Sequence, residues 1–333
     1  MAKYDQEVLK LKEQEGKTYQ EIANTLGLTY KQVNHAINRA RKARKGDIEF
    51  QDKKSPAVDN EVLNYIEKMK QLKAAAQNLN TRQVKASIRV YSDKPIGVAF
   101  WSDWHLGAIG TDYELFQRDQ RIIRDTEGLY YFGGGDYTDN YILGTPPAGH
   151  YEALIPPGMQ CQVALYHAKQ TRDKALALVR GCHDDWVKKA GDIDFMEAMC
   201  LEAQAVNLWH GGEFTIKLGG QNYLWRIRHK YKYQSSLNLE NAMRRINEIQ
   251  GPCDIAAEAH LHDGYIMERH LMGEYRVMVR GGSYKVWDEY GQKLAGYKGK
   301  PSVPVIILFP DKRKMVPVLG LETAIETLKG LRK

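Results

Sequence analysis

The sequence has few cysteines, no long apolar run and no recognisable signal peptide. Its 333 residues include four cysteines, Cys161, Cys182, Cys200 and Cys253, and none of them form a CxxC pair. So few cysteines without that spacing argue against a disulfide framework or a thiolate zinc site. No stretch approaches the roughly 20 apolar residues that cross a bilayer, so we expect no membrane association. Residues 1–15 are charged and lack an apolar signal core, and we therefore expect a cytoplasmic protein.

Acidic residues are outnumbered. The chain has 48 Lys and Arg against 41 Asp and Glu, a formal net charge of +7, which favours a polyanionic partner. Much of the excess positive charge is local, since residues 31–45 hold six basic side chains and no acidic one. This basic cluster could bind a polyanion, or it could simply be the solvated face of a helix. The remaining composition, 43% hydrophobic and 27% charged, is typical of a globular protein with one large core and a small accessory module.

Residues 1–45 carry the signals of a small helical domain. A first helix is expected at 5–15, and two capping boxes follow, Thr18 with Glu21 and Thr29 with Gln32. Gly27 lies between them, where a tight turn needs a residue that tolerates positive φ. The pattern predicts a helix-turn-helix whose apolar contacts are Ile22, Ala23, Leu26, Leu28, Val33 and Ile37.

This segment resembles the compact DNA-binding domains of resolvases and sigma factors. The resemblance implies that the second helix of the motif is a recognition helix. Side chains near its start would contact the bases of DNA: Tyr30, Lys31, Gln32, Asn34 and His35. Basic side chains further along would contact phosphates: Arg39, Arg41, Lys42, Arg44 and Lys45. The alternative is a three-helix module that contacts another protein.

Residues 46–87 are expected to join two domains. The stretch from Gly46 to Pro56 is polar and broken by Gly and Pro, as linkers are. Apolar residues then recur at helical spacing between 59 and 80: Val62, Ile66, Met69, Leu72 and Ala76. The helix they predict would pack on the second domain or pair with its copy in a homodimer.

From residue 88 onward the sequence predicts an α/β domain. Seven short apolar runs are typical of strands: IGVAFWS, LYYFGGG, ALALVRG, YLWRIRH, CDIAAEA, YRVMVRG and VPVIILF. Helical stretches such as 159–178 and 236–250 separate some of them. This alternation indicates packed sheets in a domain that spans 88–333, with ligands held by residues just beyond the strand ends.

Five of the expected strands end in possible metal ligands. In chain order these are Asp103 with His105, Asp136, His183 with Asp184, His229, and His260 with His262. A single histidine after an apolar strand is usually a satisfied buried side chain, but five strand ends in series form a pattern that chance rarely produces. The series therefore predicts a metal site.

At these residues the chain resembles the calcineurin-like metallophosphoesterases. Their motifs are D-x-H, G-D-x-x-D, G-N-H-D or G-N-H-E, a lone His and G-H-x-H, and the matching stretch runs from about Ile96 to His262. The resemblance implies a two-sheet β-sandwich flanked by helices, joined here to the all-α helix-turn-helix domain. One metal would be held by Asp103, His105 and His262, the other by His229 and His260, and Asp136 would bridge both.

The resemblance also implies how the centre works. Two divalent ions, with Mn the first choice and Fe or Zn the alternatives, would activate a hydroxide that attacks phosphorus. His183 would be catalytic at the leaving group, with Asp184 holding its imidazole. Asp139 would lie behind the ligands or beside the substrate. Proximity to the motifs alone makes three residues candidates for the substrate-side pocket wall: Tyr137, Asn140 and Trp186.

Two positions depart from the family motifs. Cys182 stands where the family has a metal-binding Asn, and Ala259 stands where it has Gly. A Cys182 thiolate could replace the amide oxygen on a soft metal; alternatively, the second site could be weak and filled only with substrate.

The two domains together suggest a DNA-directed nuclease of this superfamily, similar to its nuclease branch and to phage-encoded phosphoesterases. A phosphomonoesterase or cyclic-nucleotide phosphodiesterase that the first domain localises is one alternative. A DNA-binding protein with an inactive phosphoesterase core is another.

Overall fold

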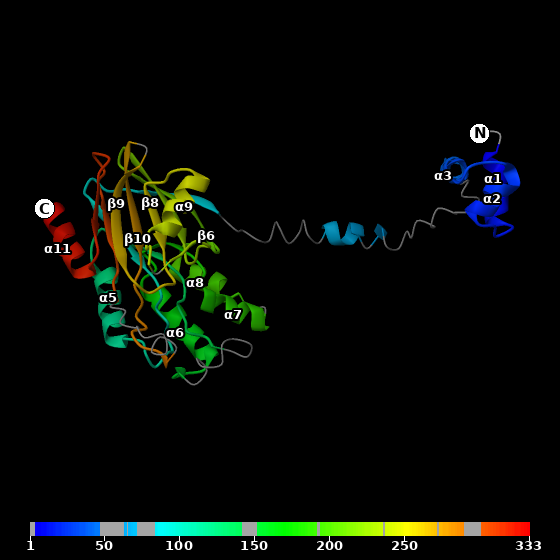
Figure 1. The fold of residues 1–333 in the computed structure, drawn as a ribbon. Coiled ribbons are helices and arrows are strands. Elements are labelled where there is room, and N and C mark those ends of the chain that lie inside the picture. The colour runs from blue at the N-terminus through cyan, green and yellow to red at the C-terminus, as the bar shows by residue number, and fades with distance from the viewer. Residues whose placement is uncertain are drawn as a thin grey trace. The chain divides into compact units, whose positions relative to one another are not determined.

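The structure is a computed structural model that describes residues 4–46, 63–64, 66–71, 84–141, 152–191, 194–235, 237–271, 273–289 and 301–333. The chain forms two compact units, Met1–Asn80 and Thr81–Lys333, and Figure 1 shows the fold of each. The division falls inside the segment 46–87 that is expected to be a linker. Among the described residues, no helix has the length and apolar character needed to cross a membrane.

The first unit is a three-helix domain whose helix ends follow from its capping residues. Its helices are α1 (Asp5–Glu13), α2 (Tyr19–Leu26) and α3 (Tyr30–Gly46). Both expected capping boxes form: the Thr18 hydroxyl accepts from the Glu21 amide, and the Thr29 hydroxyl accepts from the Gln32 amide. Gly27 ends α2 in the left-handed conformation at φ 62°. The core consists of Val8, Leu11, Ile22, Ala23, Val33, Ala36 and Ile37.

The expected helix at 59–80 falls only partly within the described residues. Residues 66–71 are helical, and their apolar side chains are exposed, with Ile66 40% and Met69 60% accessible. Val62, Leu72 and Ala76 lie outside the described residues. Dimerisation through 59–80 stays a prediction.

The second unit contains two six-stranded sheets. The order in the first is β1 (Lys85–Val90), β6 (Gly211–Leu218), β7 (Gln221–Arg228), β8 (Ile255–Glu258), β10 (Glu274–Arg280) and β9 (Tyr265–Leu271). The order in the second is β12 (Met315–Val318), β11 (Val305–Leu308), β2 (Ile96–Trp101), β3 (Leu129–Gly133), β4 (Ala175–Leu178) and β5 (Val206–Asn207).

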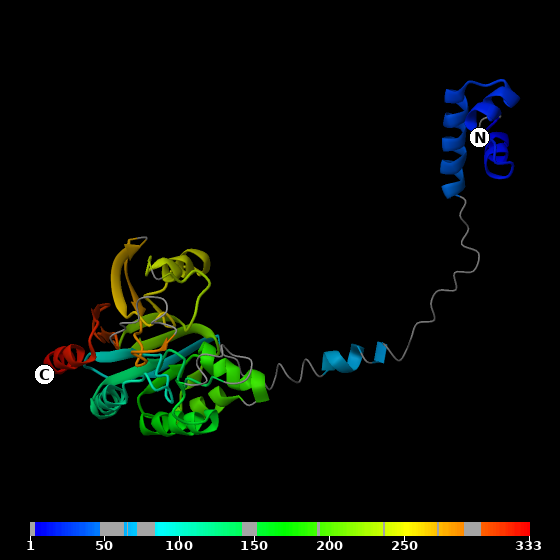
Figure 2. The same ribbon diagram turned by 60° about the horizontal axis from the view of Figure 1, so that its bottom comes forward.

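Strand alternation divides the apolar residues of this unit between two cores. In β2, Val98 and Phe100 face the other sheet, whereas Ala99 and Trp101 face the flanking helices. Those helices are α5 (Tyr113–Asp125), α6 (Pro157–Gln170), α8 (Phe195–Ala203) and α11 (Leu321–Leu331). The helix α9 (Asn241–Gln250) covers the outer face of the other sheet, so Figure 2 shows it in yellow across the sheets from the green helices. The expected sandwich flanked by helices, with an all-α N-terminal domain, is confirmed.

The element boundaries differ from the expected ones in several places. The helix expected at 159–178 ends at Gln170, because Thr171 closes it and β4 begins at Ala175. The helix expected at 236–250 begins only at Asn241. Five strands were not anticipated: β1, β5, β6, β9 and β12.

The sheet topology brings five chain segments to one edge. The strands β2, β3 and β4 are parallel neighbours, so their carboxyl ends lie together. In the other sheet, β7 and β8 are also parallel neighbours. The segments that follow these five strands are those predicted to carry metal ligands.

Candidate metal centre

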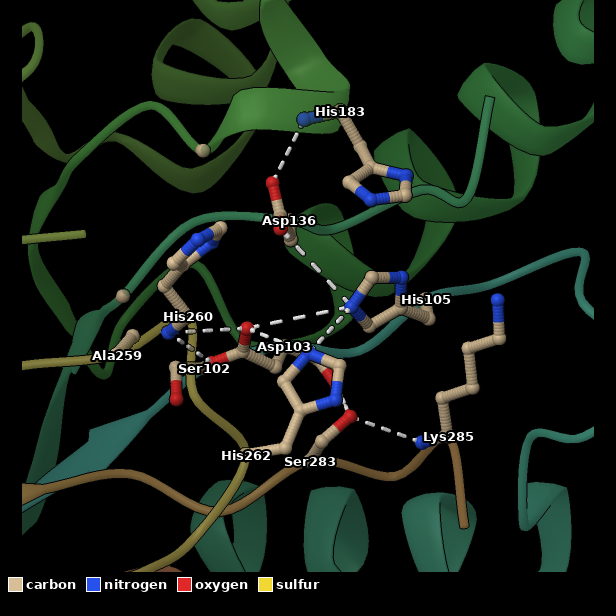
Figure 3. A network of polar contacts seen from close by, with 12 residues as sticks. Ser102, Asp103, His105, Asp136, His183, Ala259, His260, His262, Ser283 and Lys285 are labelled. Carbon is tan, nitrogen blue, oxygen red and sulfur yellow. Dashed lines mark hydrogen bonds and ion pairs between the residues drawn. The ribbon is translucent and has the colours of Figure 1, made fainter. Parts of the chain in front are cut away.

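The loops after the five strands bring the predicted ligands together. Figure 3 shows Asp103, His105, Asp136 and His262 pointing into one space. Donor atoms of these and neighbouring residues fall into four overlapping groups within 4.8 Å of one another: Asp103, His105 and His262; Asp103, Asp136 and His229; Cys182, His229 and His260; and His105, Asp136 and His183. The first and third groups correspond to the two ligand sets implied by the sequence motifs, and the second connects them through Asp136.

The first ligand set is compact and almost inaccessible. His105 Nε2 lies 3.1 Å from His262 Nε2, 3.9 Å from Asp136 Oδ2 and 4.0 Å from Asp103 Oδ1. His262 Nε2 lies 3.4 Å from Asp103 Oδ1. In the second set, His229 Nε2 lies 3.1 Å from Asp136 Oδ2. Asp136 is therefore close to both sets, as a bridging carboxylate must be.

The backbone bends sharply at the ligands. Five of them adopt positive φ although they are not glycine: Asp103 (50°), His105 (45°), Asp136 (51°), His260 (78°) and His262 (64°). Such conformations cost about 1–3 kcal/mol each and persist where the surrounding structure enforces them. The cost of five is comparable with the whole stability of a typical domain, about 5–15 kcal/mol. We conclude that the sandwich stabilises these loops in a shape that local preference opposes.

Glycines allow the loops to approach one another. A Cβ at Gly181 would lie 2.0 Å from Asp136 Oδ1, and a Cβ at Gly135 would lie 2.8 Å from His229 Nδ1. Gly135 also has φ 93°. The runs GGGD and GCHDD therefore need glycine before their functional residues, since any side chain there would displace a ligand.

The outer ring nitrogens of two histidines are already engaged. His105 Nδ1 lies 2.8 Å from Asp139 Oδ1, and His229 Nδ1 lies 2.8 Å from the Gly134 carbonyl oxygen. Because both partners are acceptors, each Nδ1 carries a proton and each Nε2 is turned toward the centre. In the neutral form of the rings, both Nε2 atoms present lone pairs toward carboxylate oxygens, which also lack protons. A cation between them would satisfy all of these groups.

The pKa shifts of the buried histidines also favour metal binding. Burial lowers the pKa of His105 to about 4, against the opposing effect of Asp139. Burial also lowers the pKa of His260 to about 4. Both imidazoles are therefore neutral, which is the form that binds metals. Burial opposes charge on His229 as well, yet the Asp136 carboxylate raises its pKa well above the usual range. A proton on His229 thus occupies the place of a metal cation.

His183 and Asp184 have different surroundings from those expected. His183 Nδ1 lies 2.5 Å from the Asp139 carbonyl oxygen, and the His183 amide donates to Asp136 Oδ1 at 2.8 Å. The Asp184 carboxylate instead accepts from the backbone amides of Asp136, Tyr137 and Gly181 at 2.9–3.1 Å. The expectation that Asp184 holds the imidazole is therefore wrong. Asp184 fixes the loop that carries Asp136, and the Asp139 carbonyl holds His183.

Asp139 and Asn140 are both buried. The Asp139 carboxylate contacts His105 at 2.8 Å and Lys285 Nζ at 3.2 Å. Asn140 donates to the Thr138 hydroxyl, and its amide nitrogen lies 3.7 Å from Cys161 Sγ. Asp139 therefore supports the predicted ligand His105 from behind, whereas these Asn140 contacts involve no predicted ligand, and a place for either residue beside the substrate stays a prediction.

Lys285 was not anticipated from the sequence. It follows β10 and is 2% exposed, and Figure 3 shows it beside His105. Three carboxylates surround its ammonium group at 3.2–3.8 Å: Asp139, Glu152 and Asp288. Asp288 is local, but Asp139 and Glu152 come from distant segments, so the sequence KVWDEY does not by itself reveal the role of this lysine.

Aromatic rings line one side of His183. The Trp186 ring centroid lies 4.1 Å from that of His183, and the Tyr141 centroid lies 5.2 Å from it. Trp186 and Tyr141 are half-buried. Trp186 was expected at the pocket wall, but Tyr137, also expected there, is fully buried in the core. Tyr141 follows Asp139 and Asn140 directly, so its place after the G-D-x-x-D motif was the signal that could have revealed it.

The candidate DNA-contacting residues lie on the third helix. Tyr30, Lys31, Gln32, His35 and Lys42 are exposed, and Asn34 is half-buried. Arg39 pairs with the buried Asp5 at 3.0 Å, and Arg41 pairs with Glu13 at 3.4 Å. The side chains of Arg44 and Lys45 lie outside the described residues. Arg39 therefore helps to hold α1 against α3 through its ion pair with Asp5, in addition to any contact with a phosphate.

Comparison with known proteins identifies one family for part of the chain. Residues 1–43 match the model of sigma-70 factors, region 4, which confirms the expected likeness to sigma factors. No curated protein sequence gives a significant match.

Solved structures similar to this one include Vps29 of Chaetomium thermophilum, at 11% identity and TM-score 0.38, covering 67% of this chain and 96% of that one. Vps29 of Entamoeba histolytica, complexed with zinc, matches at 12% identity and TM-score 0.33, covering 67% of this chain and 99% of that one. GAP50 of Plasmodium, the anchor in the inner membrane complex, matches at 11% identity and TM-score 0.36, with 68% and 84% covered. Likenesses this distant support no functional conclusion.

Proposed function

We propose that the chain is a metal-dependent phosphodiesterase of the calcineurin-like type that acts on DNA. The observation that carries this proposal is the convergence of two ligand sets on Asp136, which lies 3.1 Å from His229 and 3.9 Å from His105. The six ligands follow four strand ends and His183 follows a fifth, in the order that the superfamily's motifs have. A purely structural cluster would not need five strained backbone positions to build it.

The residues fit a pair of divalent cations. Asp103, His105 and His262 would hold one, His229 and His260 the other, and Asp136 would bridge them. When bound, two such cations neutralise phosphate charge and lower the pKa of a water molecule between them. Mn is the first choice for the nitrogen-and-oxygen set, with Fe or Zn as alternatives.

His183 is the candidate catalytic acid. It lies at the start of α7 (Cys182–Gly191), next to the ligand groups, and its Nδ1 faces the Asp139 carbonyl at 2.5 Å. That contact requires a proton on Nδ1, so His183 can act as an acid through Nε2 of the imidazolium form. A protonated Nε2 would donate to the leaving oxygen as the phosphoester bond breaks.

The surroundings of His183 favour a nucleotide substrate. Trp186 and Tyr141 present aromatic faces beside the imidazole, and base stacking on such faces contributes about 1–3 kcal/mol per base. A phosphate monoester of a protein side chain would leave these faces unused. The helix-turn-helix unit, with exposed Lys31 and Lys42, supports DNA as the polymer.

A substrate panel tests the proposal. The full chain is freed of metal, reconstituted with Mn or Zn, and assayed on bis(p-nitrophenyl) phosphate, p-nitrophenyl phosphate, supercoiled plasmid and single-stranded DNA. We expect hydrolysis of the diester and of DNA, with the monoester slower. Monoester hydrolysis alone would indicate a phosphatase, and no hydrolysis with metal fully bound would indicate an inactive core that serves binding.

A further inference from the structure

We propose that Cys182, His229 and His260 form a sulfur-and-nitrogen half-site that selects a thiophilic divalent cation, Zn²⁺, over Mn²⁺. The inference deepens the proposed function, on which it rests, by assigning different metals to the two halves of the centre. It also revises the expectation of Mn for the second position.

Three separate elements converge to build this half-site. Cys182 is the first residue of α7, His229 follows β7 directly, and His260 follows β8. Cys182 Sγ and one ring nitrogen of each histidine lie within 4.8 Å of one another. The His229 and His260 rings are 5.2 Å apart at an interplanar angle of 72°. This arrangement surrounds a space from three directions.

One ring nitrogen of this group is buried and faces a carboxylate. His229 is 2% exposed, and its Nε2 lies 3.1 Å from Asp136 Oδ2 without a hydrogen bond of acceptable geometry. Its Nδ1 is held by the Gly134 carbonyl, so the ring cannot turn Nε2 elsewhere without losing that bond. A cation at this place would bind both the imidazole and the carboxylate.

The two halves differ in the hardness of their donors. The set of Asp103, His105 and His262 offers oxygen and nitrogen, which suit Mn²⁺ as well as Zn²⁺. The set with Cys182 adds sulfur, and Asp136 supplies a fourth donor 3.1 Å from His229 Nε2. Four donors with sulfur and two imidazoles are the usual ligand number and type for Zn²⁺. An amide oxygen in place of the sulfur would remove this preference.

Cys182 is distinguished from the other cysteines by its neighbours. Among the described residues, the candidate metal-binding groups include no other cysteine. Burial raises the pKa of Cys200 and of Cys253 to about 12, so both stay protonated and do not compete. Cys161 is half-buried like Cys182 but lies on α6, which makes it a matched control.

Cobalt substitution tests the assignment in the full chain. Metal-free protein is titrated with Co²⁺ without oxygen, and its near-ultraviolet spectrum is followed for sulfur-to-cobalt charge transfer. We expect this band to grow to one equivalent in the wild type and in Cys161→Ser, and to be absent in Cys182→Ser and Cys182→Asn. Competition dialysis should show the Zn²⁺-over-Mn²⁺ preference of one site falling at least roughly tenfold in Cys182→Asn.

The outcomes separate this inference from the proposed function. If the wild type binds two equivalents of Co²⁺ and hydrolyses a diester but shows no charge-transfer band, the half-site lacks sulfur ligation and only this inference falls. A band that persists in Cys182→Ser also overturns it. If folded wild type binds no Co²⁺ at all, both fall. A thermal melt of each variant confirms that a missing band does not reflect unfolding.

Discussion

The two units of the chain obey local conformational rules to different degrees. In the helical unit, the described residues with positive φ are glycines, Gly16 and Gly27. Among the described residues of the second unit, eight other than glycine have positive φ, and six of them lie in or beside the candidate metal centre: Asp103, His105, Asp136, Asn140, His260 and His262. Strain is therefore concentrated where the chemistry is proposed.

The two units differ in how far local sequence preferences determine their structure. In the helical unit, the capping residues, the turn glycine and the apolar pattern all favour the same three-helix structure. The second unit contradicts local preference at its ligands and depends on the sandwich to hold them. The predictions below test this difference, from the largest expected effect to the smallest.

The largest effect should come from Asp136→Asn. We expect hydrolysis of every substrate to fall by roughly a thousandfold or more, about 4 kcal/mol of barrier, because a neutral amide cannot bridge two cations. Turnover of bis(p-nitrophenyl) phosphate is the measurement. Asp254→Asn, which removes another buried carboxylate in an ion pair with Arg276, is the control and should retain activity. Near wild-type turnover in Asp136→Asn would sink the two-metal assignment.

His183→Ala should have the next largest effect. We expect turnover to drop roughly a hundredfold through loss of proton donation to the leaving oxygen, while bound metal stays unchanged. Metal content by elemental analysis is measured alongside the rate. His270→Ala changes an exposed histidine on β9 and should alter neither. If metal were lost from His183→Ala, His183 would be a ligand instead.

Lys285→Met should have a smaller effect, through positioning. The lysine contacts Asp139, which bonds His105 through its carboxylate and His183 through its carbonyl. We expect kcat to fall by roughly tenfold with KM little changed. The matched control Lys174→Met removes a half-buried lysine that donates to the Thr126 carbonyl. Equal losses in both variants would mean that only general stability is affected.

Removal of residues 1–45 should have the smallest effect on chemistry. We expect hydrolysis of the small diester to stay within a few-fold of wild type, because the first strand, β1, begins at Lys85. DNA affinity and its salt dependence should fall, the log–log slope by roughly 0.9 for each phosphate that the unit neutralises. Lys42→Gln in the full chain should lower that slope by the amount expected for about one phosphate. An unchanged slope after the deletion would show that the unit binds something else.

The sequence predicted the parts of the site that local patterns encode. Asp103, Asp136 and His229 follow apolar runs, and strand ends of that kind meet at one sheet edge. The helix-turn-helix was predictable because its capping boxes and Gly27 are local signals.

Other features required the folded chain. Lys285 meets Asp139 across 146 positions, so no local pattern reveals the pair. Asp184 resembled a partner for the adjacent His183, but the α7 turn directs its carboxylate to backbone amides. The strand β5 has only two residues, too few for any alternation to be seen. Two predictions overlapped at ALAL, which was assigned both to a helix that extends to residue 178 and to a strand; it is a strand, because it pairs with β3.

The central claim is that the strained strand-end loops hold two cations that share Asp136. Anomalous diffraction from crystals of the full chain reconstituted with Mn²⁺ and Zn²⁺, collected at both metal edges, tests it directly. We predict two peaks separated by roughly 3.5–4 Å, one beside His105 and His262, the other beside His229 and His260, with Asp136 between them. No peak at these side chains, or a single peak that Asp136 does not contact, would contradict the account.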